Sequence, residues 1–228
     1  MDVLALIPAR GGSKGIARKN LQDVGGTPLV GLAAVAAAAA ASVDRVVVST
    51  DDDEIAEAAA AHGAEAPFRR PAELSGDDAG DFPVLAHALG LLRETDGYEP
   101  DVVVWLRPTS PLRTAEDVED AVALLRETGA DCVRSVCLAE HHPYWMKRLE
   151  GGRLLPYAPG ADERSHPRRQ ELPPVYRLNG AVDVVRTASA LAAGEMFPGD
   201  MRGYVMPVER SVDVDTPFDL AVARALAG

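Results

Sequence analysis

Short runs of valine, leucine and isoleucine alternate with helical patterns along most of the chain. The apolar runs that we expect to form strands are Val3–Ile7, Val46–Val48, Val102–Leu106, Cys132–Val136, Ala181–Val185 and Tyr204–Val208. The helical patterns between and after them cover Leu29–Ala41, Glu54–His62, Phe82–Arg93, Ala115–Glu127 and Pro217–Leu226. Buried strands that alternate with helices are typical of a mostly parallel sheet with helices on both faces. The sequence therefore predicts an α/β protein with three α/β/α layers.

The alternation is interrupted between residues 138 and 175. His-Pro, Gly-Gly, Pro-Gly and Pro-Pro pairs occur there, and long apolar runs are few. We interpret this segment as an inserted arm, a hairpin or flap, within a single domain that spans residues 1–228, because this length is enough for one substantial core. Two local signals accompany the helices: Thr114 with Asp117 predicts a capping box, and Asp51–Asp53 predicts a helix start.

Charge and composition exclude several classes of function. The chain has 228 residues and a net charge of -12, so general binding to nucleic acids is not expected. The alanine-rich run Gly31–Ala41 is too short to span a bilayer, and the apolar start reaches Pro8 and Arg10 too soon for a signal peptide. The two cysteines, Cys132 and Cys137, indicate no disulfide framework and are expected to be buried thiols. We expect a cytoplasmic protein with no membrane partner.

The first apolar run leads directly into a glycine-rich, basic loop. Arg10, Lys14, Arg18 and Lys19 lie within ten residues, among three glycines. Glycines allow a backbone to approach an anion closely and to offer its N–H groups. The spacing fits neither the Walker A motif nor the dinucleotide fingerprint. A basic solvated turn is the alternative, but clustered cations repel one another and need a reason to gather in so acidic a chain. We therefore predict that the loop binds a polyphosphate.

Three later segments also combine charged residues with turn residues. Trp105–Arg113 follows an expected strand and contains two arginines, with prolines that stiffen the turn. Arg168–Ala181 gathers three arginines and contains an Asn-Gly pair that predicts a turn. In Val212–Pro217, Asp213 and Asp215 are two positions apart and share one side of an extended chain. Paired carboxylates beside a phosphate site suit Mg²⁺, although Asp215 is also placed to cap the helix that follows.

Taken together and in this order, the motifs resemble those of the N-acylneuraminate cytidylyltransferases, the CMP-sialic acid synthetases. The motifs are Ile-Pro-Ala-Arg-x-x-Ser-Lys-Gly (7–15) with Lys19 and Asn20, Arg70-Pro71 with Leu74-x-x-Asp77 and His87-Ala-Leu89, Pro108–Arg113, Arg169-Gln170 with Asn179-Gly-Ala181, and Asp213-x-Asp215-Thr-Pro217. The resemblance implies a Rossmann-like nucleotidyltransferase with a small dimerisation arm that works as a homodimer. It also implies a Mg²⁺-dependent reaction in which CTP and an acidic acceptor give a CMP conjugate and pyrophosphate.

The resemblance also implies roles for individual residues. The implied nucleotide-binding set is Ala9, Arg10, Gly11, Ser13, Lys14, Lys19, Asn20, Arg70, Asp77 and Arg177. Within it, Arg10 and Lys19 are implied to be catalytic together with Asp215, and Mg²⁺ is implied to bind Asp213 and Asp215. The implied acceptor-binding set is Arg107, Lys147, Arg169, Gln170, Asn179 and Asp183. The implied partners are therefore CTP and a small anionic acceptor.

Two acceptor-side positions depart from the family pattern. The family usually has glutamine at the position of Arg107 and tyrosine at the position of Asp183. Arginine in place of an amide favours an acceptor with more negative charge, but Arg107 is also able to pair with Asp183. Two acceptors therefore stay open, a sialic-type (nonulosonic) sugar acid and a small phosphonate acid such as phosphonoformate. A non-catalytic nucleotide-binding module on the same fold and a transferase that uses another nucleotide, such as GTP, are further alternatives.

Overall fold

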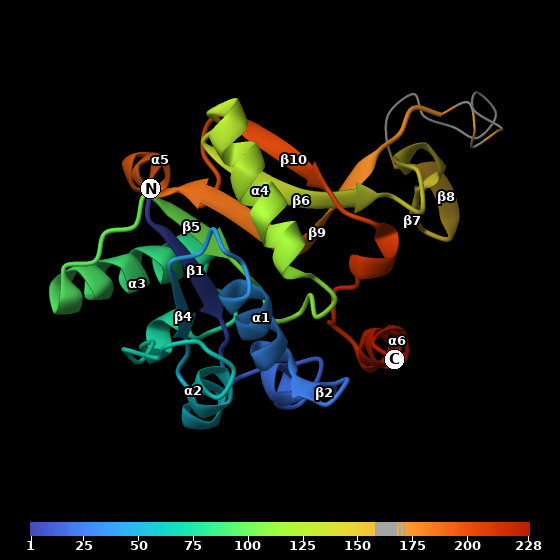
Figure 1. Cartoon of the computed structure of the whole chain (residues 1–228). Helices are drawn as coiled ribbons and strands as arrows, with labels where there is room; N and C mark the ends of the chain where they lie inside the picture. The colour runs from blue at the N-terminus through green and yellow to red at the C-terminus, as the bar shows by residue number, and fades with distance from the viewer. Residues whose placement is uncertain (158–167, 169, 171) are drawn as a thin grey trace.

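A six-stranded sheet forms the centre of the computed structural model, which describes residues 1–157, 168, 170 and 172–228 (Figure 1). The strands lie in the order β10-β6-β9-β5-β1-β4. Their bounds are β1 Val3–Pro8, β4 Arg45–Ser49, β5 Val102–Trp105, β6 Cys132–Leu138, β9 Tyr176–Arg186 and β10 Met201–Val205. All six expected strands are present. The last one begins and ends earlier than predicted, ahead of Pro207, which has no N–H for a ladder hydrogen bond.

Five strands of this sheet run in the same direction, and β9 runs against them. β9 pairs antiparallel with both β5 and β6, whereas the other neighbouring pairs are parallel. This arrangement confirms the mostly parallel sheet. The Asn179-Gly180 pair does not form the turn that the sequence predicts. The strand continues through it with a register shift against β6, and Gly180 has φ 68°, a left-handed conformation that suits glycine.

Helices cover both faces of the sheet, as the alternation predicts (Figure 1). Those on one face are α1 (Leu29–Ala38), α2 (Asp53–Ala60) and α4 (Ala115–Thr128). Those on the other face are α3 (Asp81–Asp96) and α5 (Thr187–Ala193). Within β1 the side chains alternate, because Ala5 and Ile7 join the first core and Leu4 and Leu6 join the second. The three α/β/α layers are therefore confirmed.

The C-terminal helix α6 (Pro217–Leu226) lies beside these layers, next to the small antiparallel pair β2 (Asp23–Val24) and β3 (Thr27–Pro28) (Figure 1). A third core joins them, and it contains Ile16 of the basic loop together with Val214 just before the helix. This core therefore brings a segment near the end of the chain against the loop near its beginning.

The helix caps agree with most of the local signals. The Thr114–Asp117 capping box of α4 is confirmed, and Asp52 caps α2. Helix α6 is capped by Thr216, whose hydroxyl accepts from the N–H of Asp219. The alternative in which Asp215 caps this helix is therefore wrong, and the carboxylate of Asp215 is left for other contacts.

The segment predicted as an arm begins with a hairpin that projects from one end of the sheet (Figure 1). Its strands are β7 (Lys147–Glu150) and β8 (Arg153–Pro156). The elements β2, β3 and α5 were not predicted, because two residues show no alternation in β2 or β3, and the seven residues of α5 make fewer than two helical turns. Both cysteines are buried free thiols, as expected. In the part of the chain that the structure describes, no helix has the length and apolar character needed to cross a membrane.

Asp117 is a fully buried carboxylate at the start of α4. It accepts hydrogen bonds from the N–H of Thr114, from Arg210 Nη2 at 2.6 Å and from the Tyr204 hydroxyl at 3.1 Å. Asp117→Asn leaves Arg210 without its ion pair, so we expect the free energy of unfolding to fall by about 3 kcal/mol. Urea denaturation measures the loss. Asp120→Asn removes an exposed contact with the same tyrosine and is the control, with a change below about 0.5 kcal/mol.

The same carboxylate gives stability a defined pH dependence. Burial works to raise the pKa of Asp117, but the hydrogen bonds from Arg210 and Thr114 outweigh burial and hold this pKa below its usual range. A lowered pKa contributes stability above the ordinary value, and that stability is lost as the pH falls through the folded-state pKa. The stability difference between wild type and Asp117→Asn is therefore expected to shrink below about pH 4. A difference that stays constant down to about pH 2 contradicts this ion pair.

Candidate functional site

The loops that follow β1 and β5 lie beside the segment from Arg70 to the start of α3, and together they line a cavity of about 470 Å³ at the carboxyl edge of the sheet. This edge is where open α/β sheets bind their ligands. The predicted site residues that line the cavity are Arg10, Ser13, Lys14, Lys19, Asn20, Arg70, Asp77, Arg107 and Asp215. The structure therefore gathers most of the predicted nucleotide side around one space, although Lys19 and Asp215 are 196 positions apart in the chain.

The basic loop is held against the C-terminal part of the chain by a close backbone contact. Gly15 lies so near the carbonyl oxygen of Asp215 that a Cβ on this glycine would overlap it. Ile16 and Val214 are buried together in the third core. Because Val214 points into that core, the side chains on either side of it, Asp213 and Asp215, point away from it.

Each of three cations of the loop has a carboxylate partner. Arg10 Nη2 is 2.7 Å from Asp77 Oδ1, and Lys14 Nζ contacts the other oxygen of Asp77. Lys19 Nζ is 2.9 Å from Asp215 Oδ1. Hydrogen bonds from Lys14 and Arg10 hold the pKa of Asp77 below its usual range. The carboxylates thus keep the cations together at the cavity, where phosphate oxygens can replace them as partners.

Asn20 and Arg70 are buried side chains that also line the cavity. The Asn20 amide donates to the Arg10 carbonyl at 2.9 Å, which closes the loop on itself. Arg70 donates to the Ser49 carbonyl, and burial lowers the pKa of Arg70 to about 10. Its Nε has no partner among the described residues, so this guanidinium keeps an unused donor.

The two predicted metal ligands lie at the junction of two cavities. Asp215 lines the main cavity, and Asp213 lines a second cavity of about 450 Å³. Enclosure by surrounding groups raises the pKa of Asp213. A hydrogen bond with Thr109 works in the opposite direction, and the like charge of Asp215 raises this pKa further. Two carboxylates that repel each other in this way favour a shared cation.

This donor set fits Mg²⁺ that arrives with a polyphosphate. Mg²⁺ in phosphate-transfer sites takes one or two carboxylates and completes its shell with phosphate oxygens and waters. Among the described residues, no three His, Cys, Asp or Glu side chains gather as a metal site.

Arg107 forms part of the cavity wall and is paired twice. Its Nη1 is 2.6 Å from Asp183 Oδ2, and its Nη2 is 2.5 Å from Asp81 Oδ2. Asp183 is buried and also accepts from Arg134 Nε at 3.0 Å. Burial works to lower the pKa of Arg107, but the two carboxylates outweigh burial and raise it. In the structure Arg107 therefore pairs with Asp183, as one of the two alternatives from the sequence has it. Arg107 lies at the cavity and Asp183 lies behind it.

Three residues predicted on the nucleotide side lie outside the main cavity lining. Ala9 is buried, and its N–H donates to the Ser49 carbonyl at 3.0 Å. The N–H of Gly11 donates to Asp51 Oδ1 at 2.8 Å, so it is already used within the protein. Arg177 lines the second cavity, where it pairs with Glu140.

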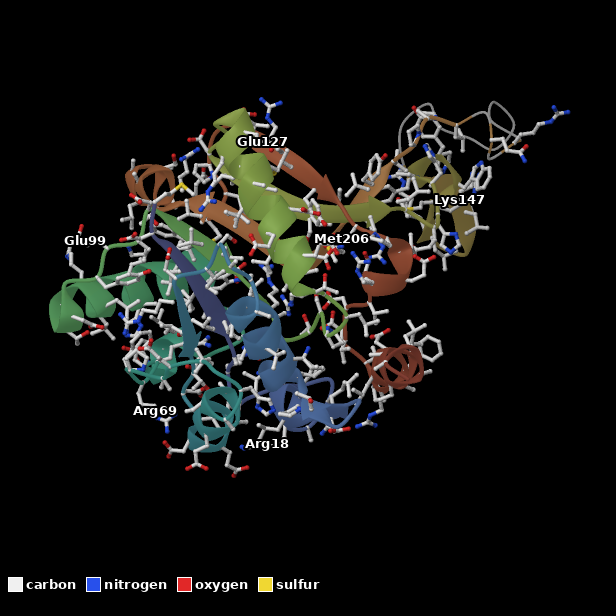
Figure 2. The ribbon with its side chains drawn as sticks, in the orientation of Figure 1. Arg18, Arg69, Glu99, Glu127, Lys147 and Met206 are labelled. Carbon is white, nitrogen blue, oxygen red and sulfur yellow. The ribbon has the colours of Figure 1, made fainter. Side chains whose placement is uncertain are left out.

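Three described residues predicted on the acceptor side, like Asp183, do not line the main cavity. Asn179 is buried, and its amide is hydrogen-bonded to the hydroxyls of two core serines. Lys147 lies on the β7–β8 hairpin, which Figure 2 shows projecting from the body of the protein. Gln170 is exposed and lines a small hollow at the base of the hairpin. Arg169 lies outside the described residues.

Other residues that line the cavity were not predicted as site residues, among them Asp81, Trp105 and Thr109. Thr109 lies in the segment singled out from the sequence, and its carbonyl accepts from the N–H of Val214 at 2.7 Å. The sequence signal for Thr109 was its position in a turn that two prolines stiffen. Asp81 carried no such signal, because only the fold brings the start of α3 to Arg107.

Comparisons with known proteins show which family this chain resembles. Residues 4–145 match the family described as Cytidylyltransferase. The chain is 31% identical over 229 residues to the CMP-N,N'-diacetyllegionaminic acid synthase of Legionella pneumophila subsp. pneumophila, a match that covers 99% of this chain and 96% of that protein. It is 32% identical over 221 residues to the N-acylneuraminate cytidylyltransferase of Streptococcus agalactiae serotype V, covering 96% of this chain and 52% of that protein.

Two solved structures have a similar fold. The CMP:2-keto-3-deoxy-manno-octonic acid synthetase complexed with CTP has a TM-score of 0.69 at 20% identity, over 99% of this chain and 98% of that chain. The 4-diphosphocytidyl-2C-methyl-D-erythritol synthase from Anaerococcus prevotii has a TM-score of 0.67 at 12% identity, over 98% and 97%. At these identities the likeness concerns the fold alone.

The contact between Gly15 and Asp215 has a direct test. Gly15→Ala pushes the loop away from the Asp215 carbonyl, so we expect the affinity for inorganic pyrophosphate to fall at least about tenfold, which is about 1.4 kcal/mol. Gly12→Ala is the matched control, because a Cβ at Gly12 meets nothing within 4 Å. Titration calorimetry measures both affinities. Equal affinities for the two variants contradict the close approach.

Proposed function

The chain belongs to the cytidylyltransferase family, and we propose that it transfers CMP from CTP to a sialic-type (nonulosonic) sugar acid with release of pyrophosphate. The observation that carries the proposal is the cavity in which the basic loop faces Asp215, with Lys19 Nζ 2.9 Å from the Asp215 carboxylate. The relative of matching length in Legionella is a synthase of the CMP conjugate of such an acid, which supports this acceptor class.

The reaction joins two anions, so their charge must first be neutralised. In the proposed reaction an acceptor hydroxyl oxygen attacks the α-phosphorus of CTP and its proton passes to solvent, the bond to the bridging oxygen breaks, and pyrophosphate leaves with the electron pair. Arg10, Lys14 and Lys19 bind the triphosphate and stabilise the charge that develops on the leaving pyrophosphate. Asn20 and Arg70 line the same cavity and are the proposed contacts of the cytosine ring.

Mg²⁺ completes the proposal. Asp213 and Asp215 would hold it, and its chemistry there is to neutralise the triphosphate and polarise the α-phosphate. In the same site Asp215 orients Lys19 through their ion pair, and Thr109 hydrogen-bonds to Asp213. In the proposal, the two carboxylates lie at the reacting end of the bound triphosphate.

The pairing of Arg107 bears on the acceptor. Its charge is compensated by Asp81 and Asp183, so this wall offers a fixed polar surface in place of a free cation. A small phosphonate acid, with two charges on a few atoms, requires free cations more than a sugar acid with one carboxylate and many hydroxyls does. The proposal therefore takes the sugar acid as acceptor.

A pyrophosphate-release assay tests the function. With CTP and Mg²⁺ we expect release with sialic-type sugar acids, and much less with phosphonoformate or with ATP, GTP or UTP as the nucleotide. Lys19→Met removes one cation from the leaving group, so we expect kcat to fall about 10²- to 10³-fold at unchanged thermal stability.

Each alternative has its own outcome in this assay. If pyrophosphate is released with phosphonoformate but with no sugar acid, the acceptor is a small phosphonate acid. If it is released with GTP in place of CTP, the assignment of cytosine as the base is wrong. Binding of CTP without release in the presence of any acceptor makes the protein a nucleotide-binding module. Dialysis against EDTA is expected to abolish release, and addition of Mg²⁺ to restore it, because Asp213 and Asp215 repel a triphosphate unless a divalent cation lies between them.

A homodimer and a cytoplasmic location are part of the proposal. The β7–β8 hairpin exposes large apolar side chains, with Leu149 and Leu154 each 70% exposed. Apolar side chains gathered on a projecting hairpin favour a protein partner, and a second copy of the chain is the proposed one. Light scattering is expected to give twice the mass of one chain for the wild type. For the double variant Leu149→Asp/Leu154→Asp it is expected to give the mass of a single chain. Because CTP is an intracellular substrate, the proposed location is the cytoplasm.

A further inference from the structure

Arg18 has a backbone conformation that residues with a side chain rarely adopt. Its φ and ψ are 52° and 40°, and within the described residues it is the one non-glycine residue with positive φ. Such a conformation persists only where the surroundings enforce it, and it concentrates at functional sites. Arg18 does not line the main cavity, but it directly precedes Lys19 and Asn20, which do.

The side chain of Arg18 is clamped at the start of α2, where Figure 2 shows it. Its Nη1 is 2.6 Å from Asp52 Oδ2, and its Nη2 is 3.2 Å from Asp52 Oδ1 and 2.8 Å from Glu54 Oε2. Asp52 is itself fixed, because it caps α2 by accepting from the N–H of Ile55 at 3.1 Å. The bidentate pair therefore ties the end of the basic loop to a helix.

The beginning of the loop rests on the same turn. The N–H of Gly11 donates to Asp51 Oδ1 at 2.8 Å, and a Cβ on Gly11 would lie 2.9 Å from Asp52 Oδ2. Both ends of the loop are thus seated on Asp51 and Asp52, directly after β4. These two carboxylates face the back of the loop and do not line its cavity side.

The left-handed residue starts the turn that directs the next two side chains. The N–H of Leu21 donates to the Arg18 carbonyl at 2.9 Å. In this turn Lys19 Nζ reaches Asp215, and the buried Asn20 amide reaches the Arg10 carbonyl at 2.9 Å. A right-handed or extended residue 18 changes the direction of the chain at this point and rotates both side chains.

We propose that Arg18 is a positioning residue for the nucleotide site, held in its left-handed conformation by Asp52 and acting through Lys19 and Asn20. The role rests on the proposed function, because it concerns the shape of the loop to which CTP binds. This role predicts that the affinity for CTP depends on how well residue 18 tolerates the left-handed conformation. It does not depend on a contact between the positive charge of Arg18 and the substrate.

Two variants of matched size separate the backbone from the charge. Arg18→Asn and Arg18→Val both remove the ion pairs with Asp52 and Glu54, but asparagine tolerates the left-handed region and a β-branched residue resists it. We expect Arg18→Val to lower kcat/KM for CTP about tenfold more than Arg18→Asn does, with most of the difference in KM. Calorimetry with CTP alone is expected to show the same difference in affinity.

A second pair tests the clamp without touching residue 18. Asp52→Asn keeps the cap of α2, since asparagine caps as well as aspartate, but removes the charge that holds Arg18. We expect KM for CTP to rise about 3- to 10-fold at unchanged melting temperature. Glu54→Gln, at an exposed contact, is the control and is expected to stay within about twofold.

The outcomes are distinct. If Arg18→Asn and Arg18→Val lower kcat/KM for CTP equally, the positioning role is overturned and the charge of the arginine is what matters. If Arg18→Val melts early, the Asp52→Asn and Glu54→Gln pair decides, and equal KM values for the two overturn the role. A wild-type protein that binds CTP but releases no pyrophosphate refutes the proposed function instead, and the CTP affinities of the same variants still decide the role of Arg18.

Discussion

The close approach of Gly15 to the main chain of Asp215 is the contact on which the rest of the site depends. It joins the first loop of the chain to the segment before the last helix, and the burial of Ile16 beside Val214 strengthens it. Without it, the cations of the loop and the carboxylate of Asp215 would not face the same cavity. The packing of α6 on β2 and β3 thereby becomes part of the architecture of the site.

Electrostatics explains how a cationic cluster persists in an acidic protein. Asp77 accompanies Arg10 and Lys14, Asp215 accompanies Lys19, and Asp52 accompanies Arg18. Each of these ion pairs lowers the repulsion among the cations of the loop. The pairs differ in their surroundings: the Asp52 side chain is 18% exposed and caps a helix, whereas that of Asp215 is 69% exposed. The carboxylate partner on the cavity side of the loop is therefore the more accessible of the two.

Much of the fold follows from local sequence, because strand and helix periods are local properties. The alternation predicts the six strands, the five long helices and the three layers, and the Thr114 capping box is visible in four residues. The antiparallel direction of β9 cannot be predicted from the sequence, because an apolar run has the same pattern in a parallel and in an antiparallel strand. Asn179-Gly180 illustrates the same limit, because pairing with β6 turns an expected turn into an irregular stretch of strand.

For the site, the sequence alone determined the chemistry: a glycine-rich loop with clustered cations, a pair of aspartates, and motifs that resemble the cytidylyltransferases in order. Residue types and spacings carry that information directly. Only the tertiary structure decided which of these residues meet. It brought Asp215 to Lys19, set Asn179 in the core, placed Arg177 in a neighbouring cavity, and paired Arg107 with Asp183. The physical reason is that charge pairing and burial are decided by distance in space, which residues far apart in the chain acquire only when the sheet and its helices have packed.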